Sequence, residues 1–322
     1  MKKRVMLQLP MNKAMREIFD PRPDIECEHF RDVSEDNIVQ HIGDYHAAVL
    51  AVDPFTARII QHAKRLQVVS RVGVGYDSVD VPALTKARIP LTITGTANSV
   101  TVAEHSLFFI LALAKRAFLY DREARKGNWS IRFQVPAYDI AGRKVLVLGF
   151  GRIGRRLVRK LVAMDMEVLV HDPYIIQDSI ACAGATPVAD WRAVLPEIDF
   201  LSVNCPKNEE TTGMVGTAEL AAMKRTAFVV NTARGGIVDE TALYLALKEK
   251  TIAGAGVDPF VVEPAPPDTP LFELDNIIVS PHSAGVTEEA MYRMSYWAAK
   301  NVVDCFDGKL NPENVVNQEV LS

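Results

Sequence analysis

Three short segments carry side chains suited to acid–base and anion-binding chemistry. They are residues 231–236 (NTARGG), 258–263 (DPFVVE) and 280–285 (SPHSAG), and each follows a predicted strand. Arg234 can hold a carboxylate through two parallel hydrogen bonds. His282 can protonate an alkoxide, and a carboxylate such as Glu263 can orient the imidazole and favour its charged form. Together these groups are what the reduction of a 2-keto acid requires.

Each of the three residues also has a plainer interpretation. In that interpretation Arg234 is a surface arginine, Glu263 is a loop carboxylate beside prolines, and His282 is a loop histidine with its own partners. All three segments, however, follow strands of one predicted parallel sheet, and ligands bind outside the carboxyl ends of such strands. Their convergence at one edge favours the chemical interpretation.

A glycine-rich turn precedes these segments in the chain. Residues 149–154 (GFGRIG) follow the apolar run KVLVL at 144–148 and lead into an amphipathic helical pattern at 155–162. In that context G-x-G-x-x-G indicates dinucleotide binding. Gly149 permits the tight turn, Gly151 lets the backbone approach a pyrophosphate, and Gly154 lets the helix pack on the strand. The alternative is an ordinary strand–helix turn.

Asp172 ends the next predicted strand, within HDPY at 171–174. A carboxylate at this distance from the glycines accepts hydrogen bonds from the adenosine ribose and repels a 2′-phosphate. The plainer alternative is a solvated aspartate before the turn-forming Pro173. We therefore expect NAD rather than NADP as the cofactor.

The elements that would position these groups form two alternating series. Strand-like runs at 5–9, 47–52, 68–72 and 91–93 come first, and a second series follows, at 144–148, 167–171, 200–204, 227–231, 252–257 and 277–280. Alternation with helical segments predicts an α/β protein with two doubly wound parallel sheets.

A long helix is expected between the two series. Thr101 and Glu104 have the spacing of a capping box, and the helical pattern runs on to Tyr120. Residues 107–114 are apolar on every side, which predicts burial between domains or subunits.

Composition limits the remaining functions. The 322 residues favour two domains, and the net charge of −4 gives no reason to expect nucleic-acid or membrane binding. The start, MKKRVMLQLPM, resembles a strand more than a signal peptide. Four cysteines (Cys27, Cys182, Cys205 and Cys305) lie far apart, so neither a metal site nor a disulfide framework is expected, and a reducing cytoplasm fits.

At this point the chain resembles a known family. The segments GFGRIG, HDPY, NTARGG, AGVDPFVVEP and SPHSAG, with RVGVGYDSVD at 71–80 and TVAEHSL at 101–107, are similar to the D-2-hydroxyacid dehydrogenases. The resemblance covers most of the chain. It implies a Rossmann NAD domain at 99–286, inserted into a discontinuous substrate domain at 1–98 and 287–322. It also implies a homodimer.

The resemblance implies roles for individual residues. Arg234, Glu263 and His282 become the catalytic trio, with backbone amides of Val74 and Gly75 holding the substrate carboxylate. Arg152 and Ile153 would meet the pyrophosphate, Cys205 and Pro206 the adenosine, and Thr232, Ala233 and Asp258 the nicotinamide. Two departures stand out: Cys205 replaces a common threonine, and no regulatory domain is expected after residue 322.

Several activities share this scaffold. Members of the family include phosphoglycerate dehydrogenases, which tend to carry an arginine in a loop that we expect at residues 50–55 (LAVDPF), over the active site. This chain has Leu50 at that place, and Asp53 nearby would repel a phosphate. We therefore expect a compact unphosphorylated acid such as hydroxypyruvate or glyoxylate, with 3-phosphoglycerate dehydrogenase as the alternative. A formate or phosphite dehydrogenase would share this fold and cofactor, but formate oxidation has no alkoxide to protonate and would leave the Glu–His pair idle. An NAD-sensing corepressor is a second, non-enzymatic alternative.

Overall fold

The computed structural model describes residues 2–321, which fall into two compact units. The described residues up to Asn98, with those from Val286 onward, form the first unit, and Ser99–Gly285 form the second. The return to the first unit thus begins one residue before the expected position 287. Each unit has its own parallel sheet and its own core, so the expected fold class, two parallel-sheet α/β domains, is confirmed.

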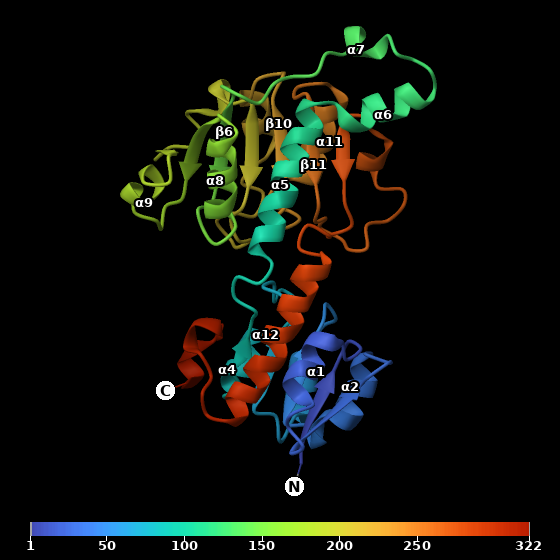
Figure 1. The fold of residues 1–322 in the computed structure, drawn as a ribbon, viewed down its shortest axis with the longest axis vertical. Helices are drawn as coiled ribbons and strands as arrows, with labels where there is room; N and C mark the ends of the chain where they lie inside the picture. Colours follow the sequence, from blue (N-terminus) through green and yellow to red (C-terminus); the bar gives the residue numbers. More distant parts are fainter. Residues whose placement is uncertain (1, 322) are drawn as a thin grey trace. The chain divides into compact units, whose positions relative to one another are not determined.

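The first unit is built on a five-stranded parallel sheet in the order β2-β1-β3-β4-β5. Its strands are β1 (Lys3–Leu7), β2 (Ile25–His29), β3 (Ala47–Leu50), β4 (Val68–Arg71) and β5 (Leu91–Thr92). Its helices are α1 (Lys13–Phe19), α2 (Glu35–His41), α3 (Ala57–His62), α4 (Val81–Lys86) and α12 (Glu288–Phe306), with the short 3₁₀ turns η1 (Ile42–Asp44), η4 (Pro312–Asn314) and η5 (Gln318–Leu321). Helices α1 and α12 cover one apolar face, and α2, α3 and α4 cover the other (Figure 1).

The second unit is a seven-stranded parallel sheet in the order β12-β11-β10-β9-β6-β7-β8. Its strands are β6 (Lys144–Leu148), β7 (Glu167–His171), β8 (Thr186–Pro187), β9 (Phe200–Val203), β10 (Phe228–Asn231), β11 (Gly254–Val257) and β12 (Ile277–Val279). Its helices are α5 (Ser99–Ala114), α6 (Ala117–Arg125), α7 (Ile131–Gln134), α8 (Gly154–Ala163), α9 (Gln177–Ala181), α10 (Thr217–Ala222) and α11 (Glu240–Lys248), with η2 (Leu195–Glu197) and η3 (Pro270–Glu273). Helices α5 and α8 pack on one face and α10 and α11 on the other (Figure 1). Counted from β6, this is the Rossmann strand order, with one strand added at the β12 edge.

The central strands form because most of their residues are apolar. β9 and β10 are buried at every position, as expected of strands with helices on both faces of the sheet. Two edge strands were not predicted. β2 (IECEH) alternates polar and apolar residues and is mostly exposed, and β8 has only two residues. Neither carries the continuous apolar run by which a buried strand is recognised.

The helix after the first unit differs from expectation in three ways. α5 begins at Ser99 rather than near Thr101, and Glu104 pairs with Lys160 at 3.2 Å instead of completing a capping box. The helix ends at Ala114, because Arg116 adopts a left-handed backbone (φ 53°) before α6 begins. Phe108 is 43 % exposed in the single chain, so burial at that position would require a second subunit.

Two further observations concern membrane spans and cysteines. Among residues 2–321, no helix combines the length and the apolar character needed to cross a lipid bilayer. The four cysteines are free thiols.

Candidate active site

Every strand of the second unit runs parallel to its neighbours, so the loops that follow the strands lie along one edge of the sheet. β6 sits beside β9, although β7 and β8 come between them in the chain, and the connections therefore leave in opposite directions there. Such a switch point opens a crevice at the carboxyl ends of the strands, where ligands bind in open α/β sheets.

The glycine-rich turn lies at this switch point. Gly149 has φ +99°, and a Cβ there would lie 2.8 Å from backbone atoms of Asn204 and Cys205 after β9. At Gly154 a Cβ would lie 2.1 Å from the carbonyl oxygen of Gly149, so only glycine lets α8 start against the turn. Both glycines are therefore required by close backbone approach.

Gly151 differs from its two neighbours in the turn. It is exposed, and a Cβ would meet no described atom within 4 Å. Nothing in the protein itself therefore explains a glycine there, whereas a phosphate lying against the backbone would. Arg152, exposed, and Ile153, partly buried, come between this residue and the first turn of α8. The residues present fit a pyrophosphate at the N-terminus of this ten-residue helix.

Asp172 follows β7 and is tied to the glycine turn. Its Oδ2 accepts a hydrogen bond from the backbone N–H of Phe150 at 2.7 Å, and Oδ1 accepts one from Tyr174 N–H at 3.0 Å. The carboxylate is thus held beside the turn rather than pointing freely into water.

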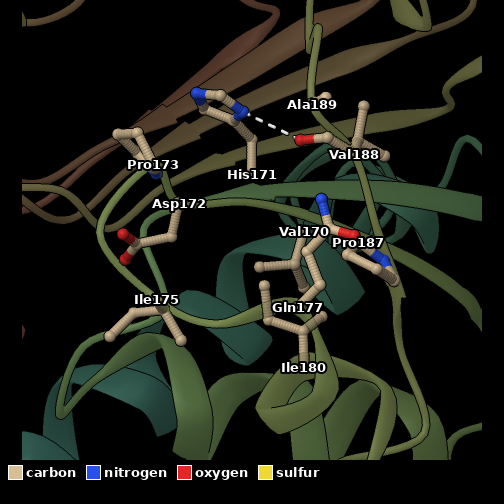
Figure 2. A pocket seen from close by; sticks show the side chains of 10 residues that line it. All are labelled: Val170, His171, Asp172, Pro173, Ile175, Gln177, Ile180, Pro187, Val188 and Ala189. Carbon is tan, nitrogen blue, oxygen red and sulfur yellow. Dashed lines mark hydrogen bonds between the residues drawn. The ribbon is translucent and has the colours of Figure 1, made fainter.

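A cavity of about 240 Å³ borders Asp172. Figure 2 shows the side chains that line it, from the end of β7, the start of α9 and the β8 region, with His171 Nδ1 2.9 Å from the carbonyl of Val188. Cys205 and Pro206, the expected adenosine contacts, lie outside this lining. Burial, with a smaller contribution from the nearby Asp172, raises the pKa of the Cys205 thiol to about 11, so this thiol is neutral at physiological pH.

Arg234 lies in the loop that follows β10. Asn231 braces this loop: its side-chain Nδ2 donates to the carbonyl of Arg234 at 2.8 Å, and its Oδ1 accepts from Ala233 N–H at 3.1 Å. The guanidinium Nη1 donates to the carbonyl of Ala233 at 2.7 Å. Arg234 is partly buried.

The loop of Arg234 presses against the loop that leads to Glu263. A Cβ at Gly235 would lie 2.1 Å from the backbone carbon of Phe260 and 2.4 Å from the nitrogen of Val261. Gly235 therefore has a structural reason: it lets the loops after β10 and β11 touch through their backbones.

His282 and Glu263 are brought together. His282 Nδ1 lies 2.7 Å from Glu263 Oε2, and the second oxygen of the carboxylate, Oε1, accepts from Phe260 N–H at 2.9 Å. With Nδ1 facing a carboxylate, the ring donates there and leaves Nε2 for a reacting group. Both side chains are partly exposed, at 46 % for His282 and 36 % for Glu263.

Asp258 and Thr232, the expected nicotinamide neighbours, also make hydrogen bonds within the protein. Asp258 is 1 % exposed, and its carboxylate accepts the N–H groups of Ser283 at 2.7 Å and Ala284 at 3.0 Å. Thr232 is buried, with its hydroxyl 2.7 Å from that of Ser106 on α5. Ala233, between Thr232 and Arg234, is partly exposed.

Sequence reasoning overlooked the side chains that hold these loops, above all Asn231 and two neighbours on α5, His105 and Ser106. The sequence of α5 carries one signal for such contacts, because His105 and Ser106 are adjacent polar residues within a strongly apolar helix. A buried polar side chain needs a partner, which predicts a contact but not its identity.

The remaining candidates belong to the first unit. Val74 and Gly75 lie partly exposed in the loop after β4, whose Gly73 carbonyl accepts both the N–H and the hydroxyl of Thr94. Leu50, expected in a loop, is instead the fully buried last residue of β3, so its side chain belongs to the core and the loop starts at Ala51.

A doubly wound sheet with a dinucleotide turn and a histidine–carboxylate pair at one edge defines a nucleotide-dependent oxidoreductase. Residues 107–284 match the family described as D-isomer specific 2-hydroxyacid dehydrogenase, NAD binding domain. The chain is 38 % identical over 288 residues to a glyoxylate reductase of Korarchaeum cryptofilum, covering 88 % of this chain and 86 % of the reductase. It is 34 % identical to a D-3-phosphoglycerate dehydrogenase of Archaeoglobus fulgidus, over 91 % of this chain but only 55 % of that enzyme.

A solved structure agrees with these relatives. The NAD-dependent formate dehydrogenase of Staphylococcus aureus in complex with NAD matches with a TM-score of 0.85 at 25 % identity, covering 98 % of each chain. The chain belongs to the D-isomer-specific 2-hydroxyacid dehydrogenase family. It is an NAD-dependent oxidoreductase that acts on a 2-hydroxy acid or the corresponding keto acid, as expected from the sequence.

Proposed function

We propose that this enzyme interconverts glyoxylate or hydroxypyruvate and the corresponding 2-hydroxy acid, with Arg234, Glu263 and His282 as its catalytic residues. The observation that carries the proposal is the 2.7 Å contact between His282 and Glu263, at the sheet edge that also holds the glycine turn. Such a pair has a use when an alkoxide must be protonated, and it has none in formate oxidation.

The cofactor contacts in this proposal follow the geometry of the turn. Gly149, Gly151, Arg152, Ile153 and Gly154 would hold the pyrophosphate. Asp172 would bind the adenosine ribose, with Cys205 and Pro206 alongside the adenosine, and Thr232, Ala233 and Asp258 would border the nicotinamide. The chemistry that NADH supplies when bound is hydride donation to the carbonyl carbon of the substrate.

The protein's own groups complete the reaction. Arg234 holds the substrate carboxylate through its guanidinium and so orients the carbonyl. His282, charged and paired at Nδ1 with Glu263, gives the proton on Nε2 to the oxygen that becomes the hydroxyl. The ring is then neutral and takes a proton from solvent before the next turnover. In the reverse direction, Nε2 accepts the hydroxyl proton.

Val74 and Gly75 remain proposed donors to a substrate carboxylate. Among the described residues, their backbone N–H groups make no hydrogen bond to a backbone carbonyl. Two successive N–H groups without a partner form the kind of concavity that binds an anion.

The preference for an unphosphorylated substrate is supported by the loop after β3. Leu50 is buried in the core of the first unit, and the loop that follows offers Val52, 73 % exposed, and the acidic Asp53. Neither attracts a phosphate. The glyoxylate reductases among the relatives match this chain over most of their length, which also supports the smaller acid.

Steady-state kinetics with NADH and three keto acids test this proposal. We expect kcat/KM to be highest for glyoxylate or hydroxypyruvate and lower for phosphohydroxypyruvate. The highest value for the phosphorylated acid would contradict the substrate class while leaving the catalytic residues in place. No NADH consumption with any 2-keto acid would favour a binding protein on this scaffold.

We also propose a homodimer, working in the cytoplasm. Large apolar side chains are exposed along α5, α6 and the segment around α7: Phe108 (43 %), Phe118 (55 %), Trp129 (66 %) and Phe133 (79 %). Neither α6 nor α7 has a buried residue in the single chain, which suits a segment covered by a second copy. The four free thiols fit a reducing compartment. Light scattering at micromolar concentration should give the mass of two chains, and Trp129→Glu should shift it toward one.

A further inference from the structure

Helix α5 presents two consecutive side chains to two different loops of the candidate active site. His105 Nε2 lies 3.1 Å from the hydroxyl of Ser280, two residues before His282. Ser106 Oγ lies 2.7 Å from the hydroxyl of Thr232, two residues before Arg234. One turn of this helix therefore contacts both loops that carry the proposed proton donor and carboxylate clamp.

The direction of the hydrogen bonds can be worked out from the available protons. The hydroxyl of Ser280 donates to Asp258 Oδ1, which uses its only proton. Ser280 must therefore accept from His105, so His105 carries its proton on Nε2. Burial lowers the pKa of His105, with Asp258 acting in the opposite direction, and the neutral Nε2–H form is the one that this arrangement uses.

The chain of hydrogen bonds ends on the loop of His282. Asp258 accepts the N–H groups of Ser283 and Ala284 through its carboxylate, and its backbone carbonyl accepts the N–H of His282 at 3.2 Å. His282 itself has a left-handed backbone, φ 50°. A non-glycine residue keeps that conformation only where its surroundings hold it there.

Helix α5 is held against the sheet by close packing around His105. The ring of His105 packs edge-on against Phe109, with the centroids 4.5 Å apart. Phe109 is fully buried and lies on β11, where a Cβ at Gly256 would come within 2.7 Å of its ring. This close packing of α5 on β11 sets the position of His105 relative to β11 and to Asp258.

We propose that His105 is a positioning residue for His282: through Ser280 and Asp258 it holds the 280–284 loop so that His282 meets Glu263 in the productive orientation. Ser106 supports the loop of Arg234 in the same way through Thr232. The inference rests on the proposed role of His282 as the proton donor. A purely structural alternative is that His105 serves only as an aromatic packing residue beside Phe108 and Phe109.

Two substitutions separate these roles. His105→Phe keeps an aromatic ring but removes the donor, whereas His105→Gln keeps an N–H donor at a similar reach and removes the ring. Ser280→Ala cuts the same connection from the other side without touching the helix. Glu104→Gln, an exposed neighbour on α5, is the control for general disturbance of the helix.

We expect His105→Phe and Ser280→Ala to lower kcat for keto-acid reduction by up to about 100-fold, the effect of a small misplacement of a reacting group. NADH affinity, measured by fluorescence, should stay unchanged. His105→Gln should recover most of the activity, and Glu104→Gln should resemble wild type. The double variant His105→Phe/Ser280→Ala should be no worse than either single one, because both remove one connection.

A measurement that does not depend on enzymatic activity keeps this test independent of the proposed function. In histidine-labelled protein, NMR should show the Nδ1–H signal of His282 weakened or moved in His105→Phe and restored in His105→Gln. Equal loss of activity in the Phe and Gln variants, or an unchanged His282 signal in His105→Phe, would overturn the inference. Near-normal turnover of His282→Ala would instead refute the proposed function, and the NMR result would still report on the positioning.

Discussion

Nδ1 of His282 lies 2.7 Å from Oε2 of Glu263, while Oε1 of the same carboxylate accepts the backbone N–H of Phe260 at 2.9 Å. One glutamate thus connects the loop after β11 to the imidazole in the loop after β12. The loop of Arg234 meets the same stretch of backbone at Gly235. The three proposed catalytic residues therefore share a framework of backbone contacts.

The first prediction concerns the proton donor. His282→Ala should reduce the rate of keto-acid reduction by roughly 10²–10⁴-fold, the usual effect of losing a positioned acid. NADH binding, followed by fluorescence titration, should persist because the glycine turn is untouched. A nearly unchanged kcat would mean that another group supplies the proton.

The second prediction concerns the orientation of His282 by Glu263. Glu263→Gln keeps an oxygen that can accept a hydrogen bond from Nδ1 of His282, whereas Glu263→Ala removes the 2.7 Å partner of that nitrogen. Glu263→Gln should therefore lose less kcat for keto-acid reduction than Glu263→Ala, because the imidazole keeps its hydrogen bond. Equal losses of kcat in the two variants would exclude this orienting role.

The third prediction concerns cofactor choice. Asp172→Asn keeps an acceptor for Phe150 N–H but loses the charge that repels a 2′-phosphate. The ratio of kcat/KM for NADH to that for NADPH should fall in this variant, and it should fall further in Asp172→Ala. Asp178→Asn, an exposed change on α9, serves as the control and should leave the ratio as it is. A wild-type enzyme that uses both cofactors equally would rule out this assignment.

The fourth prediction uses two glycines of one turn as a matched pair. At Gly154 a Cβ would collide with the Gly149 carbonyl, so Gly154→Ala should lower the free energy of unfolding by roughly 1–3 kcal/mol. At Gly151 no described atom lies within reach, so Gly151→Ala should leave stability intact and weaken NADH binding. Urea unfolding and fluorescence titration measure the two effects. Normal NADH affinity in a folded Gly151→Ala variant would place the pyrophosphate elsewhere.

The fifth prediction concerns stability against pH in the first unit. Nδ1 of His46 accepts the backbone N–H of Arg4 at 3.1 Å, and burial, followed by the charges of Lys3, Arg65 and Arg4, lowers the pKa of His46 below its usual 6.5. Below that value the unfolded chain binds more protons than the folded one, so this residue makes stability fall as pH falls. His46→Gln should flatten the decline of the urea midpoint between neutral and mildly acidic pH. The exposed His29→Gln should leave the decline as in wild type.

Several elements followed from local pattern alone. The strands Lys144–Leu148 and Glu167–His171 have the predicted bounds, because each is a short, mainly apolar run that ends at a turn. The edge strand Ile25–His29 and the break at Arg116 were missed. An edge strand is stabilised by pairing with its neighbour rather than by its own apolar pattern, and a left-handed arginine leaves no trace in composition.

The sequence by itself determined the chemistry available to this protein: a glycine turn after a buried strand, a carboxylate after the next strand, and arginine, glutamate and histidine after later ones. Those features are local, and parallel strand order brings their loops to one edge. Only the tertiary structure decided how the groups are held, because the supporting contacts join residues far apart in the chain: His105 with Ser280, Ser106 with Thr232, and Gly235 with Phe260. Such contacts depend on the packing of α5 against the sheet and of one loop against another, and no spacing rule within the chain encodes them.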